Sequence, residues 1–251
     1  MPQFSGVLYC IRRTMNNWPD IIGIPLWVWI FGLPLSLALF AAVRPIWVTD
    51  HLKPIWSILD RTYTLAGYLA AFFMCIILLI TIGQMGSRWL GITFEGSTEF
   101  AGYAMAATSF FALAHALSHG SHIRVSVFLN LNNWTKYWLN VFALALSAIV
   151  ATYFARFAVK TNKMSAMLND RTQGQDQIPD YVAQFLELLG TAPDKWGALM
   201  DKATGEMIYT PMWVPQLTMS IGTILLAVCL WDHLIRLVAT KTSQIKQEVL
   251  E

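Results

Sequence analysis

Three histidines that follow one another closely are the residues most capable of chemistry. His115, His119 and His122 stand at i, i+4 and i+7, so they share one face of a continuing helix. Imidazole nitrogens bind zinc, but no Cys, Asp or Glu lies nearby in the sequence to complete a tetrahedral site. The spacing favours a structural role, in which these histidines end a helix before Gly120 and meet lipid headgroups or a partner protein.

A second arrangement pairs His115 with His233. Each lies near the end of a predicted membrane helix, and the two ends are expected on the same side of the membrane. A membrane cytochrome needs two axial histidines at matched depth. A haem-binding subunit of an electron-transfer complex is therefore one alternative function, which a Soret band in the visible spectrum would reveal. A structural accessory of another membrane assembly is a second alternative.

Other reactive combinations are missing from the sequence. We find no paired carboxylates at one membrane depth, no nucleophile with a base, and no phosphate-cradling glycine loop, so we predict no enzyme, no metal and no cofactor. Cys75 and Cys229 lie within apolar runs and are typical of small buried hydrophobic residues. A net charge of +2, evenly scattered, gives no electrostatic basis for a nucleic-acid partner.

The elements that would position these residues are membrane helices. Of the 251 residues, 56% are hydrophobic and 13% charged, whereas a soluble domain carries roughly 25% charged residues. Each of four apolar stretches is close to the roughly 20 residues that a spanning helix needs, namely 62–87, 100–118, 137–159 and 212–231. The middles of these stretches hold almost no ionisable groups, so the coupling-ion site of a complete transporter is missing. The sequence predicts a subunit that supports another protein's transport pathway.

Charge in the connections predicts the orientation of the bundle. The loop after the second stretch carries Arg124 and Lys136 and no acid, whereas residues 161–211 hold four basic and seven acidic residues. The first connection is therefore expected in the cytoplasm and the second in the periplasm, with both ends of the chain cytoplasmic.

The predicted fold class is an all-α integral membrane protein, a four-helix bundle with two additions. An N-terminal arm, 1–57, contains an apolar segment at 21–43 that is broken by Gly32-Leu33-Pro34, which favours a re-entrant or interfacial hairpin over a fifth span. Residues 58–160 carry the first three spans, and 212–251 the fourth span with a cytoplasmic tail. Between them, 161–211 form a long periplasmic insertion, expected to hold two amphipathic helices at 180–189 and from 193 onward.

Small residues on the second span predict its packing face. Gly102, Ala106, Ser109, Ala112 and Ala116 form a stripe of the kind through which membrane helices approach closely.

The second span and its flanks resemble a known family. The segment STEFAGYAMAATSFFALAHALSHGSHIRV is similar to the small membrane subunit of TRAP transporters, the Q component. The likeness lies in Glu99, which opens the span, in its small-residue middle, and in a G-x-H-I-R-V turn that contains His122 and Arg124. Upstream, Gln84 and Arg88 match a Q-x-x-x-R-[YW] pattern at the end of the first span.

The resemblance implies a role within a three-part importer in the bacterial inner membrane. A periplasmic solute-binding protein would capture an organic solute such as a carboxylate, and a large membrane subunit would move it by a sodium-driven elevator motion. This chain would enlarge the fixed scaffold, in contact with both partners and with membrane lipids. The matching residues Gln84, Arg88, Glu99, His122 and Arg124 would then be partner-interface or membrane-anchoring residues.

Overall fold

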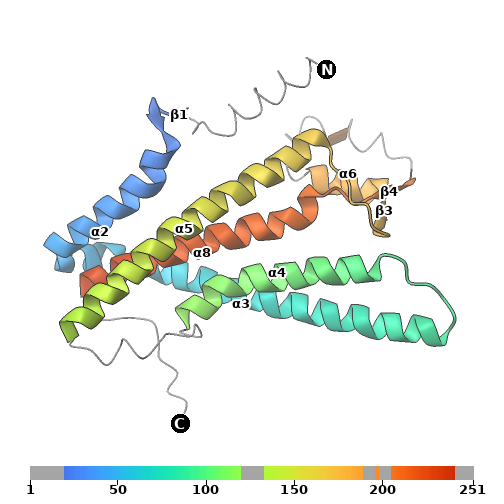
Figure 1. Cartoon of the computed structure of the whole chain (residues 1–251), viewed down its shortest axis with the longest axis horizontal. Coiled ribbons are helices and arrows are strands. Elements are labelled where there is room, and N and C mark those ends of the chain that lie inside the picture. Colours follow the sequence, from blue (N-terminus) through green and yellow to red (C-terminus); the bar gives the residue numbers. More distant parts are fainter. Residues whose placement is uncertain (1–19, 120–132, 189–195, 198–204, 241–251) are drawn as a thin grey trace, which may run out of the picture.

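Four helices of membrane-spanning length dominate a computed structural model of the chain, which describes residues 20–119, 133–188, 196–197 and 205–240 (Figure 1). They are α3 (Pro45–Trp89), α4 (Ser97–Ser118), α5 (Asn133–Leu168) and α8 (Trp213–Thr240). The four predicted spans and the all-α membrane fold are thereby confirmed. In every case the helix extends beyond the predicted apolar stretch, because polar residues continue the helix past the stretch that fits the hydrocarbon.

Two antiparallel helix pairs form the bundle. A short turn after Trp89 joins α3 to α4, and its Gly91 and Gly96 adopt φ values of +68° and +73°, which L side chains rarely adopt. The second pair, α5 and α8, lies beside the first through α4 and α8 (Figure 1). Of the four helices α8 is the most buried and α3 the least. We call the end where α3 finishes and α8 begins the insertion end, and the other the opposite end.

Small side chains allow these helices to approach closely. An added Cβ on Gly67 of α3 would lie 2.6 Å from the His115 ring, and one on Gly222 of α8 would lie 2.6 Å from the Phe110 carbonyl oxygen. The buried residues of α4 that form its packing face are Ala104, Ala107, Phe111 and Ala114. The predicted small-residue stripe was therefore wrong in its position: Gly102 and Ser109 are exposed. The neighbouring helices instead pack against an adjacent row of α4 residues, which includes the large aromatic residue Phe111.

The apolar N-terminal segment is a continuous helix rather than a hairpin. Its last eleven residues form α2 (Leu33–Val43), which follows directly on a π-helical turn, η1 (Val28–Gly32). Gly32 and Leu33 both keep right-handed helical angles, so the break expected at Gly32-Leu33-Pro34 is absent. The wider π turn absorbs the irregularity that Pro34 introduces by lacking an N–H.

This segment packs on the bundle at both of its ends. Ala38 and Ala41 of α2 are buried against Ile235 and Ala239 of α8, and the Phe31 ring lies 5.3 Å from the Tyr153 ring of α5. Ahead of it, β1 (Asp20–Ile21) pairs with β2 (Ile24–Pro25).

The insertion contains strands that the sequence did not predict. β3 (Gln177–Pro179) pairs with β4 (Met207–Tyr209), and between them α6 (Asp180–Leu188) confirms the first expected amphipathic helix. The second expected helix falls largely outside the described residues, although 196–197 are helical. In Figure 1 these elements lie together at the insertion end, beside the ends of α5 and α8.

Candidate functional site

Three of the five predicted site residues come together at the insertion end. Gln84, near the end of α3, donates hydrogen bonds from Nε2 to Ser97 Oγ at 2.7 Å and to Thr98 Oγ1 at 3.2 Å, both in the first turn of α4. Ser97 in turn donates to the Phe94 carbonyl oxygen at 2.7 Å. The amide of Gln84 therefore fixes the start of α4 against the end of α3.

Glu99 joins α4 to the insertion. Its Oε1 accepts a hydrogen bond from the Gln175 backbone N–H at 3.1 Å, and Gly174 lies so close that an added Cβ would be 2.9 Å from that oxygen. A carboxylate in the first turn of a helix also faces the positive end of the helix dipole. Arg88 is exposed, and within the described ranges it makes no ion pair with Glu99.

A second, fully buried carboxylate anchors the same junction. Asp176 accepts hydrogen bonds from the Tyr103 hydroxyl at 2.6 Å and from Thr172 Oγ1 at 2.8 and 2.9 Å. Its carbonyl oxygen accepts another from Thr210 Oγ1 at 2.6 Å. Burial raises the pKa of the Asp176 carboxyl, but the hydrogen bonds from Tyr103 and Thr172 outweigh burial and hold the pKa below its usual range.

A surface hollow lies beside this junction, between the end of α3 and the start of α4. It encloses about 340 Å³, and its lining includes Gln84, Arg88, Glu95 and Thr98. Charged and hydroxyl groups thus meet at the turn that joins the two helices.

The remaining predicted residues do not form a site in the described structure. His122 and Arg124 fall outside the described residues. His115 is a packing residue: its ring lies against Gly67, and its Nδ1 is 3.3 Å from the Tyr63 carbonyl oxygen. His119 ends α4, with its ring 4.1 Å from that of His115. His119 therefore fits the predicted position at a helix end, whereas His115 packs against α3 inside the bundle. The described part of the structure does not support the haem alternative.

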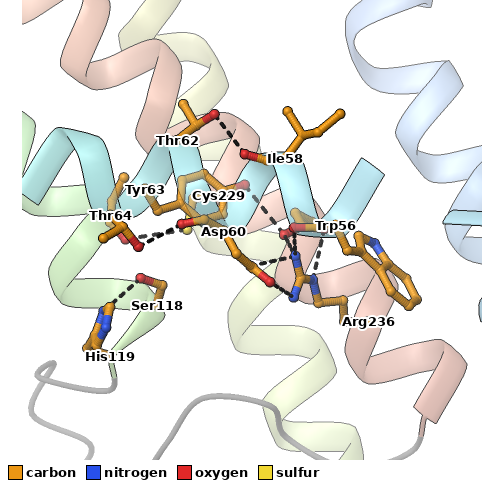
Figure 2. A network of polar contacts seen from close by, with 12 residues as sticks. Trp56, Ile58, Asp60, Thr62, Tyr63, Thr64, Ser118, His119, Cys229 and Arg236 are labelled. Carbon is orange, nitrogen blue, oxygen red and sulfur yellow. Dashed lines mark hydrogen bonds and ion pairs between the residues drawn. The ribbon is translucent and has the colours of Figure 1, made fainter. Parts of the chain in front are cut away.

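A charged cluster at the opposite end was not predicted. Arg236 of α8 donates from Nη2 to Asp60 Oδ1 at 2.8 Å and from Nη1 to Asp60 Oδ2 at 3.2 Å (Figure 2). The same guanidinium donates from Nε to Asp232 Oδ1 at 3.1 Å and lies 5.2 Å from the centre of the Trp56 ring. Tyr63 reaches Asp232 Oδ2 at 3.4 Å. One arginine therefore forms ion pairs with two carboxylates from two helices.

Part of this cluster has a sequence signal and part does not. Asp232 and Arg236 are an i,i+4 pair of opposite charge, a spacing that predicts contact on a helix. Asp60 and Tyr63 meet them only through the packing of α3 on α8, 169 or more residues away in sequence. Asp176 likewise lies in a polar stretch with no pattern that distinguishes it from its neighbours.

The arrangement defines a class of protein: a helical membrane protein in which buried polar side chains, such as those of Asp176 and Asp232, bind partners on other elements and hold helices and loops together. Residues 77–192 match the family model for the DctQ component of tripartite ATP-independent periplasmic transporters. The match covers 116 of the 251 residues and is consistent with the four membrane-length helices of the chain. The match begins in the last third of α3 and extends through α6, so it takes in the first part of the insertion. No curated protein and no solved structure matches the chain.

Proposed function

We propose that this chain is the small scaffold subunit of a TRAP-type secondary transporter in the bacterial inner membrane. It would act with a periplasmic solute-binding protein and a large, sodium-coupled elevator subunit to import an organic carboxylate. The observation that carries the proposal is the match of residues 77–192 to a family of transporter components.

The distribution of charge supports a mechanical role. No Asp, Glu, Lys or Arg occurs in 62–87, 100–118, 137–155 or 212–231. Charged groups in the middle of a membrane protein mark ion and substrate pathways, and the spans offer none. The charged residues Asp60, Asp232 and Arg236 instead form ion pairs with one another at the opposite end of the bundle.

The outer surface supports a role beside a partner. Large apolar side chains along α3, such as Leu65, Phe72 and Leu79, are more than half exposed, so this helix faces lipid or another subunit over its length. A bundle with a broad apolar exterior enlarges the frame against which a moving domain slides, and interfacial Trp and Arg residues hold its tilt.

Co-purification tests the assignment to a transporter. A tagged chain, expressed with its chromosomal neighbours and extracted in mild detergent, should bring along a membrane protein of roughly a dozen spans, and reconstituted uptake should need both of them with a binding protein. A gene for a periplasmic binding protein beside this one is a further expectation. Uptake or electron transfer by this chain alone would disprove the scaffold role.

We propose further that the insertion faces the periplasm and contributes to binding-protein docking. Tyr181 and Phe185 are an i,i+4 pair on α6 and are 50% and 59% exposed, so they offer a surface that can be changed without disturbing the core. Replacing both by Ser should weaken capture of the binding protein in a pull-down. Replacing Ile55 and Ile58 of α3 by Ser is the matched control, because these two apolar residues are 49% and 63% exposed and lie outside the insertion. Unchanged capture by the double variant would remove the insertion from the docking surface.

A further inference from the structure

The end of α4 sets two imidazole rings side by side. His115 and His119 are four residues apart on this helix, and the centres of their rings are separated by 4.1 Å. A zinc ion with metal–nitrogen bonds of about 2.1 Å can join two nitrogens that lie up to about 4.2 Å apart. Rings at this separation can therefore present one nitrogen each to the same ion.

Backbone carbonyl groups determine which nitrogen of each ring carries the proton. His115 Nδ1 lies 3.3 Å from the Tyr63 carbonyl oxygen, and His119 Nδ1 lies 3.0 Å from the His115 carbonyl oxygen. A carbonyl oxygen only accepts hydrogen bonds, so Nδ1 is the donor in each neutral ring and Nε2 keeps its lone pair. Within the described ranges neither Nε2 has a hydrogen-bond partner. Histidines that bind metal ions have this arrangement, in which the second ring nitrogen donates to an oxygen.

The two rings differ in how they are held. The His115 ring packs against α3, where an added Cβ on Gly67 would lie 2.6 Å from the Cγ and Nδ1 atoms of the ring, so a glycine is needed to make room for it. The His119 side chain is exposed, and its Nδ1 also lies 3.1 Å from Ser118 Oγ (Figure 2). One ring is therefore fixed by a neighbouring helix, and the other is accessible to an ion from solution.

The position of the pair favours a cation. The C-terminal end of a helix carries the negative end of the helix dipole, and His119 ends α4 directly after the apolar stretch 100–118. Within the described ranges no group of three or more His, Cys, Asp or Glu side chains could share an ion. Water can occupy the remaining positions around a metal ion, as it does in zinc sites that are open to substrate.

We propose that His115 and His119 together bind a divalent transition-metal ion, such as zinc or copper, through their Nε2 atoms. This inference revises the expectation of no metal, which rested on the lack of side chains for a complete tetrahedron. Because His115 packs on α3, the bound ion also fixes the end of α4 relative to α3. Cu²⁺ binds more tightly than Zn²⁺, as it does at most nitrogen sites. The site is a property of this chain and does not depend on the proposed transport function.

The test uses the purified full chain with a tag that contains no histidine. After removal of metals by a chelator, titration with Zn²⁺ against a competing dye should show one site per chain. His119→Ala should weaken this site at least about tenfold, because the second imidazole of a chelating pair acts at a high effective concentration. His115→Gln, which keeps a polar side chain beside Gly67, should weaken it as much. With Cu²⁺, electron paramagnetic resonance should show two bound imidazoles in the wild type and one in His119→Ala.

Two other histidines supply the controls. His51 is exposed on α3 and its Nδ1 lies 2.9 Å from the Trp47 carbonyl oxygen, but its ring stacks on Trp47 rather than on a second imidazole. His51→Ala and His122→Ala should both leave the affinity unchanged, and circular dichroism should show the same helix content for all variants. Equal losses in His51→Ala and His119→Ala, a single imidazole on Cu²⁺ in the wild type, or a loss in His122→Ala without one in His115→Gln would each overturn the proposal.

Discussion

Arg236 joins α8 to α3 by a two-pronged hydrogen-bonded ion pair with Asp60. The same guanidinium also pairs with Asp232 one turn earlier on its own helix. The Asp232 side chain is 3% exposed and that of Asp60 is 55% exposed, so the two carboxylates differ in how much they depend on the arginine.

Removal of Arg236 should therefore cost more than removal of Asp60. Arg236→Leu leaves the Asp232 charge buried without a partner, and breaking a buried pair in this way typically costs about 3–5 kcal/mol. Asp60→Asn removes a half-exposed partner and should cost about 1 kcal/mol or less. Thermal unfolding in detergent should rank the variants in that order. Equal effects of the two substitutions would show that the buried charge is not the source of the loss.

Glycines at the helix contacts should be sensitive to a single methyl group. Gly222→Ala places a Cβ against the Phe110 backbone, which cannot move without shifting α4, and overpacking of this kind costs about 1–3 kcal/mol. Gly86→Ala is the matched control, because nothing lies within 4 Å of its added Cβ, and Ala favours the helix by about 0.5–1 kcal/mol over Gly. Melting temperatures should fall for the first variant and hold or rise for the second. A rise in both, as helix propensity alone would give, would show that the contact with Phe110 does not govern the Gly222 position.

The attachment of the insertion to α4 should be stable at neutral pH and fail in acid. The pKa of the Asp176 carboxyl is lower in the folded protein than in the unfolded chain. Such a carboxyl stabilises the fold at any pH above its unfolded-state pKa, and this stabilisation is lost as the pH falls through its folded-state pKa. The ordinary value for Asp is about 3.9, so the attachment should hold at pH 7 and pH 5 and loosen only below about pH 4. A spin label at the exposed position 173, in a chain without its three native cysteines, should gain mobility in that acid range.

Asp176→Asn supplies the control for the acid transition. The amide carries no charge, and its NH2 group, which donates, replaces one of the two oxygens that accept from Tyr103 and Thr172. The label should be mobile at pH 7 in this variant and should show no further change in acid. An acid transition that persists in Asp176→Asn would assign it to another group.

Glu99 should act through its acceptor oxygen rather than through an ion pair with Arg88. Glu99→Gln keeps an oxygen that can accept from the Gln175 N–H, whereas Glu99→Ala does not. Hydrogen exchange at the Gln175 amide should be slow in the wild type and in Glu99→Gln. It should be faster in Glu99→Ala, by the roughly fivefold that the loss of a hydrogen bond of about 1 kcal/mol implies. Rapid exchange in Glu99→Gln would show that the charge itself is required.

The spans were predictable from the sequence because a membrane helix is specified locally. Each needs an uninterrupted apolar stretch of sufficient length, and all four stretches have it. The same local reasoning predicted a break at Gly32-Leu33-Pro34 that the structure does not have, because a π turn absorbed the proline. It also predicted the wrong packing stripe on α4, since small residues occupy more than one row and the neighbouring helices decide which is buried.

The site residues also divide into those that a sequence pattern predicts and those that only the folded structure reveals. Gln84 and Glu99 were found through a family pattern, and both make contacts across the junction at the insertion end. Asp60, Tyr63 and Asp176 had no pattern, because their partners are distant in sequence and only the assembled fold brings them together. Arg88 and Glu95 stand seven positions apart, and the turn between them sets both beside one hollow.

The burial of α8 has a consequence for how the protein is made. α8 is the last of the four spans to leave the ribosome, yet its residues fill the middle of the bundle and provide the arginine that neutralises Asp60. The three earlier helices thus enter the membrane before their common core has formed. At that stage Asp60 lacks the arginine with which it pairs in the folded protein. A chain cut short before residue 213 would present an open, unpaired surface in the bilayer, and quality-control proteases recognise such unfinished products.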